Sequence, residues 1–72
     1  MTNQMEVPVQ LNGELRDVPA GLMVGELLVH LDLNPRLVVV EHNGDILRRE
    51  AYETTPVAAG DTLELVHFVG GG

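Results

Sequence analysis

Apolar and polar side chains alternate with a strict period of two in residues 5–11. This pattern predicts a strand with one face against a core and the other face in solvent. Asn12-Gly13 follows at once and suits the positive φ values of a type I′ turn, so we predict a hairpin whose second strand covers residues 14–18. Pro8 has no N–H to donate, and we expect a bulge or a missing ladder bond at this position.

The pattern becomes helical from residue 23. Four apolar residues have the i, i+3, i+4, i+7 spacing of one helix face: Val24, Leu27, Leu28 and Leu31. Asn34-Pro35 ends the predicted helix, because the residue before a proline avoids the α region. The start of the helix is weakly marked, because Met23 cannot cap the first turn as Ser, Thr, Asp or Asn would.

Three further strands are predicted in the second half of the chain. Residues 37–40 form a continuous apolar run, which is typical of an interior strand covered at least partly on both faces. Asn43-Gly44 marks a second hairpin, which returns through residues 46–47. Residues 48–60 are polar and irregular and are predicted to form a loop, and the last strand runs over residues 62–68.

The predicted order of elements is strand, strand, helix, strand, short strand, loop, strand. One helix packed across a mixed sheet of four to five strands is an α+β domain with two layers. A ubiquitin-like β-grasp has this order, although the order alone does not fix which strands pair. We therefore predict a β-grasp domain over residues 1–68.

The sequence ends in Val69-Gly70-Gly71-Gly72. Glycine buries no side chain and loses more conformational freedom on being ordered than any other residue, so this segment contributes nothing to a core. We predict that residues 69–72 form a flexible tail that another protein holds.

The strand before this tail has a predicted outer face. If Leu63 and Leu65 point into the core, the pleat turns Val66 and Phe68 to the opposite side. Exposed apolar clusters on small proteins often mark partner surfaces, so Val66 and Phe68 are the predicted partner interface. The alternative is that Phe68 folds over the edge of the core.

The composition of the chain excludes several classes of function. The chain has 72 residues, a net charge of -7, four arginines, no lysine and no cysteine. One small acidic domain lacks the basic face that nucleic acid requires, and it has no disulfide or thiol nucleophile. No run approaches the roughly 20 apolar residues of a membrane span, and the start lacks the features of a signal peptide. We therefore expect a cytoplasmic protein that binds neither nucleic acid nor membranes and is monomeric when free.

Two clusters were considered for chemistry. His30, His42 and His67 lie in different predicted elements without the close spacing of a zinc motif, so no metal site is predicted. Glu41, His42 and Asp45 gather around a turn, where polar residues serve solvation and local hydrogen bonds, and no pocket is predicted around them. No catalytic residue is assigned.

Several segments together carry a family resemblance: the first strand with its Asn12-Gly13 turn, residues 24–28, residues 38–44, Gly60-Asp61 and the ending over residues 66–72. In these segments the chain resembles the sulfur carrier proteins of thiamine biosynthesis, the ThiS family, which are ubiquitin-like β-grasp proteins. Two positions depart from the family pattern. Met23 stands where the family usually has a capping threonine, and Pro8 interrupts the first strand, so both departures concern local stability.

The resemblance implies a mechanism at Gly72. An adenylating enzyme similar to the ubiquitin-activating type would use ATP and magnesium to form an acyl adenylate on the Gly72 carboxylate. Sulfur from a persulfide, made by a cysteine desulfurase, would displace AMP and leave a thiocarboxylate, which thiazole synthase would consume. The terminus would enter the active sites of both enzymes through narrow channels, with Val69, Gly70 and Gly71 as the threading segment that precedes it. The chain itself would be a cosubstrate, not an enzyme, and would bind no cofactor.

Three alternatives have the same predicted fold. One is the small subunit that donates sulfur in molybdopterin synthesis, and another is a ubiquitin-like modifier conjugated to lysines of other proteins. The third is a β-grasp interaction module whose glycine tail is inert.

Overall fold

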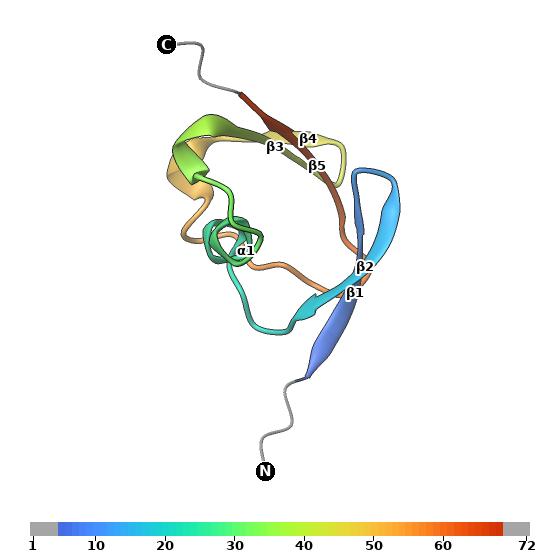
Figure 1. Ribbon diagram of the computed structural model, residues 1–72. Coiled ribbons are helices and arrows are strands. Elements are labelled where there is room, and N and C mark those ends of the chain that lie inside the picture. Colours follow the sequence, from blue (N-terminus) through green and yellow to red (C-terminus); the bar gives the residue numbers. More distant parts are fainter. Residues whose placement is uncertain (1–4, 69–72) are drawn as a thin grey trace.

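The computed structural model describes residues 5–68, which form one helix and a five-stranded sheet (Figure 1). Two short 3₁₀ helices, η1 and η2, precede the third strand and follow the fourth. The elements in chain order are β1 (Glu6–Leu11), β2 (Glu14–Pro19), α1 (Val24–His30), η1 (Pro35–Leu37), β3 (Val38–His42), β4 (Asp45–Leu47), η2 (Arg49–Ala51) and β5 (Thr62–His67). The predicted α+β class and the predicted order of strands and helix are confirmed.

The sheet is mixed, with the strand order β2-β1-β5-β3-β4. β5 pairs in parallel with β1, and every other pair of neighbours is antiparallel. The last strand of the chain is therefore the central strand of the sheet. The sheet curves around α1, which lies on its concave side (Figure 1). This is the predicted β-grasp arrangement, with the pairing that the order of elements alone left open.

Both predicted Asn-Gly hairpins are present. Asn12 and Gly13 have φ values of 51° and 83°, and Asn43 and Gly44 have φ values of 52° and 90°. These left-handed values match the twist of the flanking strands in a type I′ turn. The two turns connect β1 to β2 and β3 to β4.

Pro8 lies within β1 without a bulge, because the register with β2 runs unbroken along the whole strand. Every second residue of β1 directs its backbone groups toward β5. On that side the Gln10 N–H donates to the Asp61 carbonyl (2.9 Å), and the Pro8 carbonyl accepts from the Gly60 N–H (2.7 Å). Pro8 therefore lacks its N–H on the side of β1 that faces β5, at a position that precedes the first residue paired with β5. No hydrogen bond between β1 and β2 is lost. The expected bulge is wrong.

The core fills the space between α1 and the concave face of the sheet. Its most deeply buried side chains come from the helix and from four of the five strands: Val9, Val18, Val24, Leu27, Leu28, Val38, Val40 and Leu63. The predicted apolar face of the helix is confirmed, with Leu31 only half-buried at its end. Within residues 5–68, no helix is long and apolar enough to cross a membrane.

The first turn of α1 is capped by groups other than a side chain at Met23. The Glu26 Oε1 atom accepts a hydrogen bond from the Met23 N–H (2.8 Å). The Gly25 N–H, which has no partner within the helix, donates to the Tyr52 carbonyl (2.8 Å). A Cβ on Gly25 would lie 3.4 Å from that carbonyl oxygen, so glycine leaves room for this close approach.

The segment over residues 48–60 contributes to the core, contrary to the prediction of a polar loop. Tyr52 is 4% exposed and Val57 is 6% exposed. The Tyr52 hydroxyl donates to the Val38 carbonyl at 2.7 Å. Single buried residues in an irregular segment have no period, and this is why the pattern of the sequence did not reveal them.

Candidate functional site

The outer face of the sheet, away from α1, carries two large apolar side chains at the end of β5. Leu63 is fully buried and Leu65 is half-buried on the helix side, whereas Val66 is 55% exposed and Phe68 is 56% exposed. The predicted alternation along the strand is confirmed, and the alternative that Phe68 folds over the core is wrong. The role of Val66 and Phe68 as a partner interface stays a prediction.

Three more apolar side chains belong to the same face. Val39 lies directly opposite Val66 in the β3–β5 register, and the Phe68 N–H donates to the carbonyl of Leu37 at 2.8 Å. Ile46, 70% exposed on β4, extends the face further. We call these residues, Leu37, Val39, Ile46, Val66 and Phe68, the apolar sheet patch. Its members on β3 and β4 could not be predicted from the sequence, because cross-strand register sets which residues become neighbours.

The described chain ends at the patch. Because the Phe68 N–H donates to the carbonyl of Leu37, the last residue of η1, the backbone is hydrogen-bonded up to the last described residue. Val69, Gly70, Gly71 and Gly72, the predicted threading tail, lie outside the described residues. The last described residue of the chain is therefore Phe68, whose side chain is exposed on the apolar sheet patch.

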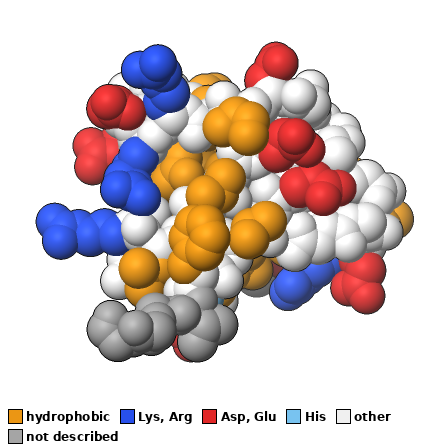
Figure 2. Space-filling view, turned by 90° about the horizontal axis from the view of Figure 1, so that it is seen from above, with side chains coloured by type: hydrophobic (Ala, Val, Ile, Leu, Met, Phe, Trp, Pro, Cys, Tyr) orange, Lys and Arg blue, Asp and Glu red, His pale blue; other side chains and the backbone are white. Residues whose placement is uncertain are grey.

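Opposite charges border the apolar sheet patch. Figure 2 shows a strip of hydrophobic side chains with basic and acidic side chains on one side and acidic side chains on the other. Glu41 and Glu64 lie directly opposite each other on β3 and β5. On other elements, the Arg49 Nη2 atom donates to the Arg36 carbonyl at 2.9 Å, which joins η2 to η1. The protein is acidic overall, but a partner of this face meets groups of both signs.

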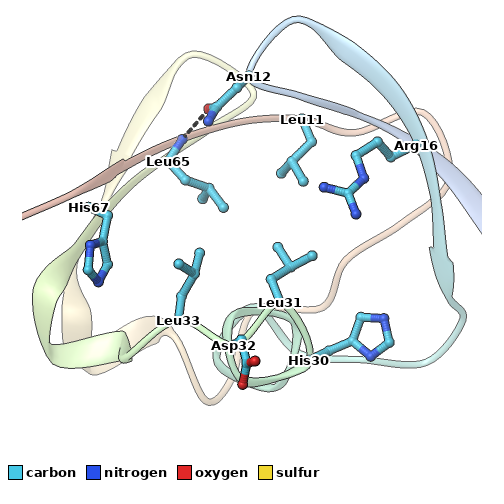
Figure 3. A pocket seen from close by; sticks show the side chains of 9 residues that line it. All are labelled: Leu11, Asn12, Arg16, His30, Leu31, Asp32, Leu33, Leu65 and His67. Atoms are coloured by element: carbon cyan, nitrogen blue, oxygen red, sulfur yellow. Dashed lines mark hydrogen bonds between the residues drawn. The ribbon is translucent and has the colours of Figure 1, made fainter.

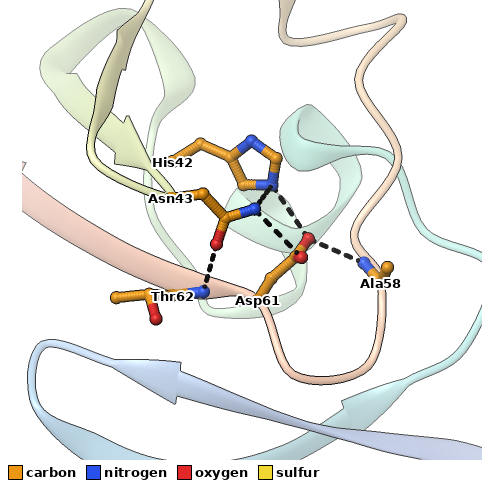
Figure 4. A network of polar contacts seen from close by, with 5 residues as sticks. All are labelled: His42, Asn43, Ala58, Asp61 and Thr62. Atoms are coloured by element: carbon orange, nitrogen blue, oxygen red, sulfur yellow. Dashed lines mark hydrogen bonds and ion pairs between the residues drawn. The ribbon is translucent and has the colours of Figure 1, made fainter.

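A second polar cluster joins the β3–β4 turn to the turn before β5 (Figure 4). The His42 Nε2 atom lies 2.8 Å from Asp61 Oδ2, which also accepts the Ala58 N–H (2.9 Å). The Asn43 side chain donates to Asp61 Oδ1 (3.2 Å) and accepts the Thr62 N–H (2.8 Å). Both carboxylate oxygens of Asp61 thus have polar contacts within the fold. The cluster therefore has a structural role, because it holds the two turns together.

Replacing Asp61 by Asn is expected to destabilise the fold mainly near neutral pH. Partial burial raises the pKa of Asp61, but hydrogen bonds from Ala58, His42 and Asn43 outweigh it and hold the pKa below its ordinary value of 3.8. A lowered pKa in the folded state stabilises the fold above the ordinary value, and this stabilisation is lost as the pH falls through the folded-state pKa. Urea unfolding near pH 7 should show that Asp61→Asn lowers the free energy of unfolding by about 1–2 kcal/mol.

The matched control is Asp17→Asn, at an exposed position on β2. Asp17→Asn should change the free energy of unfolding by less than about 0.5 kcal/mol, both near pH 7 and at about pH 2.5. The difference between Asp61→Asn and the wild type should shrink at about pH 2.5, because the stabilisation by the wild-type carboxylate declines as the pH falls below 3.8 toward the lowered folded-state pKa. An Asp61→Asn effect that is the same at both pH values would contradict this account.

The residues considered for catalytic or metal roles do not form one site. Glu41 lies on the outer face of the sheet, whereas His42 contacts Asp61. His30 and His67 line a separate cavity on the inner side of the sheet. In the part of the chain that the structure describes, no three His, Cys, Asp or Glu side chains converge as metal ligands would.

The geometry can be compared with known proteins. The model of the ThiS family matches residues 9–72, which include the central strand, the apolar sheet patch and the glycine ending. The chain belongs to the ThiS family. It is 39% identical to the sulfur carrier protein ThiS of Bacillus subtilis, and the alignment covers 89% of this chain and 98% of that protein.

Other relatives of this ThiS-family chain are much longer than it is. It is 42% identical to a thiazole synthase of Paramagnetospirillum magneticum and 38% identical to one of Magnetococcus marinus. These alignments cover 86% and 89% of the chain but only 19% and 20% of the two synthases. The chain therefore spans about a fifth of these two relatives.

The fold of a solved ThiS structure agrees with that of this chain. The crystal structure of a thiamine biosynthesis protein (ThiS) from Geobacter metallireducens superposes with a TM-score of 0.76 at 40% identity. The superposition covers 92% of this chain and 100% of the Geobacter metallireducens chain. The agreement supports the β-grasp assignment along nearly the whole length.

Proposed function

We propose that this chain is a sulfur carrier protein for thiazole formation in thiamine biosynthesis. The observation that carries the proposal is the ThiS family match, which runs through Gly72, together with the nearly end-to-end similarity to the Bacillus subtilis sulfur carrier. The absence of cysteine is in keeping with it, since sulfur would then be carried on the backbone terminus. The proposal requires Gly72 to present its carboxylate as the end of the mature chain.

The proposed reaction takes place on the Gly72 carboxylate in a partner's active site. A carboxylate is a poor electrophile, so one of its oxygens first attacks the α-phosphorus of ATP and displaces pyrophosphate, with magnesium held by the adenylating partner. The outer sulfur of a persulfide, generated by a cysteine desulfurase, then displaces AMP from the acyl carbon and forms an acyl disulfide. A thiol reductant cleaves the S–S bond of this acyl disulfide and is itself oxidised to a disulfide with the other sulfur. The resulting thiocarboxylate is the sulfur donor for thiazole synthase. The carrier supplies a substrate group and no catalytic side chain.

The glycine ending suits this use physically. Without a Cβ, glycine passes through narrow channels and adopts either sign of φ. Four extended residues, 69–72, reach about 13–14 Å, enough to enter a recessed active site. Ordering them costs about 1–2 kcal/mol for each residue, so the tail weakens binding and cannot drive it.

The docking energy is therefore assigned to the apolar sheet patch. Its exposed side chains include Phe68, only four residues before Gly72 in the sequence, so a partner bound to the patch would be close enough to receive Gly72. Glu41 and Glu64 form a like-charge pair across two strands, which is unfavourable until a basic group approaches them. The proposed partner surface is thus apolar with a lysine or arginine opposite this pair.

Thiazole synthase is the proposed acceptor among the partners. Two proteins named thiazole synthase contain a stretch similar to this chain, which places a carrier-like sequence and that named activity in one polypeptide. A separate carrier chain would have to form the corresponding contact between molecules. The adenylating enzyme is the second proposed partner, and it would use the same tail at a different time.

The direct test of the proposed function is the intact mass of the chain. The chain is incubated with ATP, magnesium, the adenylating enzyme, a persulfide donor and a thiol reductant. The mass should increase by the difference between one sulfur and one oxygen atom, and the product should support thiazole formation by thiazole synthase. An unchanged mass, under conditions that convert the Bacillus subtilis carrier, would reject the proposal.

Phe68→Ala is expected to weaken binding to the adenylating enzyme by about tenfold or more, because a large aromatic at the centre of an interface commonly contributes over 1 kcal/mol. Since Phe68 is 56% exposed, the stability of the fold should change by less than about 1 kcal/mol. Calorimetric titration and urea unfolding measure the two effects separately.

Leu15→Ala is the matched control for Phe68→Ala. Leu15 is 69% exposed on β2, at the edge of the sheet and two strands away from β5. Its truncation should leave binding within about twofold of the wild type. Equal losses of affinity in the two variants, or unfolding of Phe68→Ala, would remove the apolar sheet patch as the docking site.

A further inference from the structure

A cavity of about 510 Å³ lies on the inner side of the sheet, between the β1–β2 turn and the end of α1. Figure 3 shows the side chains of Leu11, Leu31, Leu33 and Leu65 pointing into it from different elements. Leu31, Leu33 and Leu65 are only half-buried, so their exposed parts form an apolar floor. An apolar side chain of another molecule could occupy this space without displacing any part of the core.

The edge of β5 is incompletely paired beside this cavity. β1 pairs with β5 only as far as Leu63 and then turns away at Asn12. The Asn12 N–H donates to the Leu63 carbonyl (2.9 Å), and the Asn12 Oδ1 atom accepts the Leu65 N–H (2.7 Å) in place of a further strand residue. Beyond it, the Leu65 carbonyl and the His67 N–H face the same side, and neither is bonded by another described residue.

The two unpaired groups have the spacing of a sheet ladder. In a parallel pair, one residue donates its N–H to the carbonyl of residue i−1 of the neighbouring strand and accepts the N–H of residue i+1. With Val66 as residue i, one residue of an added strand can therefore bond both the Leu65 carbonyl and the His67 N–H. Such strand addition gives affinity through the backbone and specificity through alternate side chains.

The charges around the cavity differ from those of the whole protein. The chain has a net charge of -7, yet the polar rim includes Arg16, His30 and His67. In Figure 3 the Arg16 guanidinium is directed toward the cavity, whereas the carboxylate of Asp32 points away from it. A segment that carries carboxylates fits this rim better than a basic one does.

We propose that this cavity and the adjoining edge of β5 bind an extended segment of a partner protein in which a leucine-sized side chain is flanked by carboxylates. The apolar side chain enters between the leucines, the backbone extends the sheet at Leu65 and His67, and a carboxylate meets Arg16. The site lies on the face of β5 opposite the apolar sheet patch, so both can be occupied at once. The proposal does not depend on the sulfur chemistry, and its test uses none.

The test uses the peptide acetyl-Glu-Asp-Leu-Asp-Glu-amide and the full ¹⁵N-labelled chain in NMR titrations. We expect saturable amide shifts at Asn12 and at Leu65–His67, with a Kd of about 1 mM because only one side chain is buried. Hydrogen exchange of the His67 amide should slow at saturation. Arg16→Glu should weaken binding about tenfold, which corresponds to the loss of one charged contact. Arg48→Glu, the same change at an exposed arginine outside the cavity, should bind like the wild type.

Several outcomes would overturn the proposal. One is the absence of saturable shifts, and another is an equal effect of Arg16→Glu and Arg48→Glu in chains whose other amide positions are unchanged. Equal binding of a peptide with lysines in place of the four acidic residues would reject the charge argument. Equal binding of a peptide with glycine in place of leucine, or the same shifts with acetate alone, would show that the cavity takes only an anion.

Discussion

Removal of Gly72 is expected to abolish thiocarboxylate formation while leaving the folded domain intact. An extended residue spans about 3.3–3.6 Å, so the carboxylate of a chain that ends at Gly71 stops short of the reacting atoms by that distance. A misplacement of about 1 Å can cost roughly 100-fold in rate, and we expect at least this loss. The measurement is the rate of the sulfur-for-oxygen mass change with ATP, magnesium, the adenylating enzyme, a persulfide donor and a thiol reductant.

The matched control is a chain that lacks Thr2, which is shortened by the same one residue at the other end of the sequence. This chain should be converted at close to the wild-type rate. The chain without Gly72 should still bind the adenylating enzyme and compete with the wild type, because docking is assigned to the apolar sheet patch. Conversion of the chain without Gly72 at the wild-type rate would mean that Gly72 is not required as the reacting residue.

This deletion and Phe68→Ala test two separate parts of the proposed function. The deletion should remove the chemistry and keep the affinity, whereas Phe68→Ala should lower the affinity and keep the chemistry at saturating partner concentration. This separation follows from the cost of ordering glycines, which leaves the affinity to the globular face. If the two changes had the same effect on both quantities, docking and reaction would not be distinct steps.

The local parts of the fold could be predicted from the sequence because their causes are local. The Asn12-Gly13 and Asn43-Gly44 turns follow from the φ values that these residues accept, and both are present. The alternation along β1 and the helical spacing from Val24 also led to the correct elements. At the candidate site, the alternation along β5 was enough to predict that Val66 and Phe68 are exposed.

The parts that could not be predicted depend on pairing between distant residues. Val39 joins Val66 on the outer face only because of the β3–β5 register, which no short pattern encodes. Asn12 was predicted as a turn residue, but its side chain also bonds the Leu65 N–H, 53 positions later in the chain. Pro8 was expected to disturb the sheet, and it does not, because its missing N–H lies on the β5 side of β1, before the pairing with β5 begins at Gln10.

Tyr52→Ala is expected to remove a large part of the free energy of unfolding of the domain. Tyr52 is 4% exposed, its hydroxyl bonds the Val38 carbonyl, and its own carbonyl accepts the first-turn N–H of Gly25 in α1. Truncating a buried aromatic to alanine costs about 3–5 kcal/mol. A domain of this length has a stability of about 4–11 kcal/mol, so the loss is a large part of the total. Urea unfolding followed by circular dichroism measures it.

Tyr52→Phe separates the contribution of the hydroxyl from that of the ring. It keeps the ring volume and removes only the bond to the Val38 carbonyl, so the expected loss is about 1–2 kcal/mol. Glu53→Ala, at the exposed neighbouring position, should change stability by less than about 0.5 kcal/mol. If Tyr52→Ala were no more destabilising than Glu53→Ala, the segment over residues 48–60 would be a loop without a structural role, as its polar composition had predicted. If instead Tyr52→Phe were as damaging as Tyr52→Ala, the hydroxyl would be the main contribution, because the Val38 carbonyl is left buried without a partner.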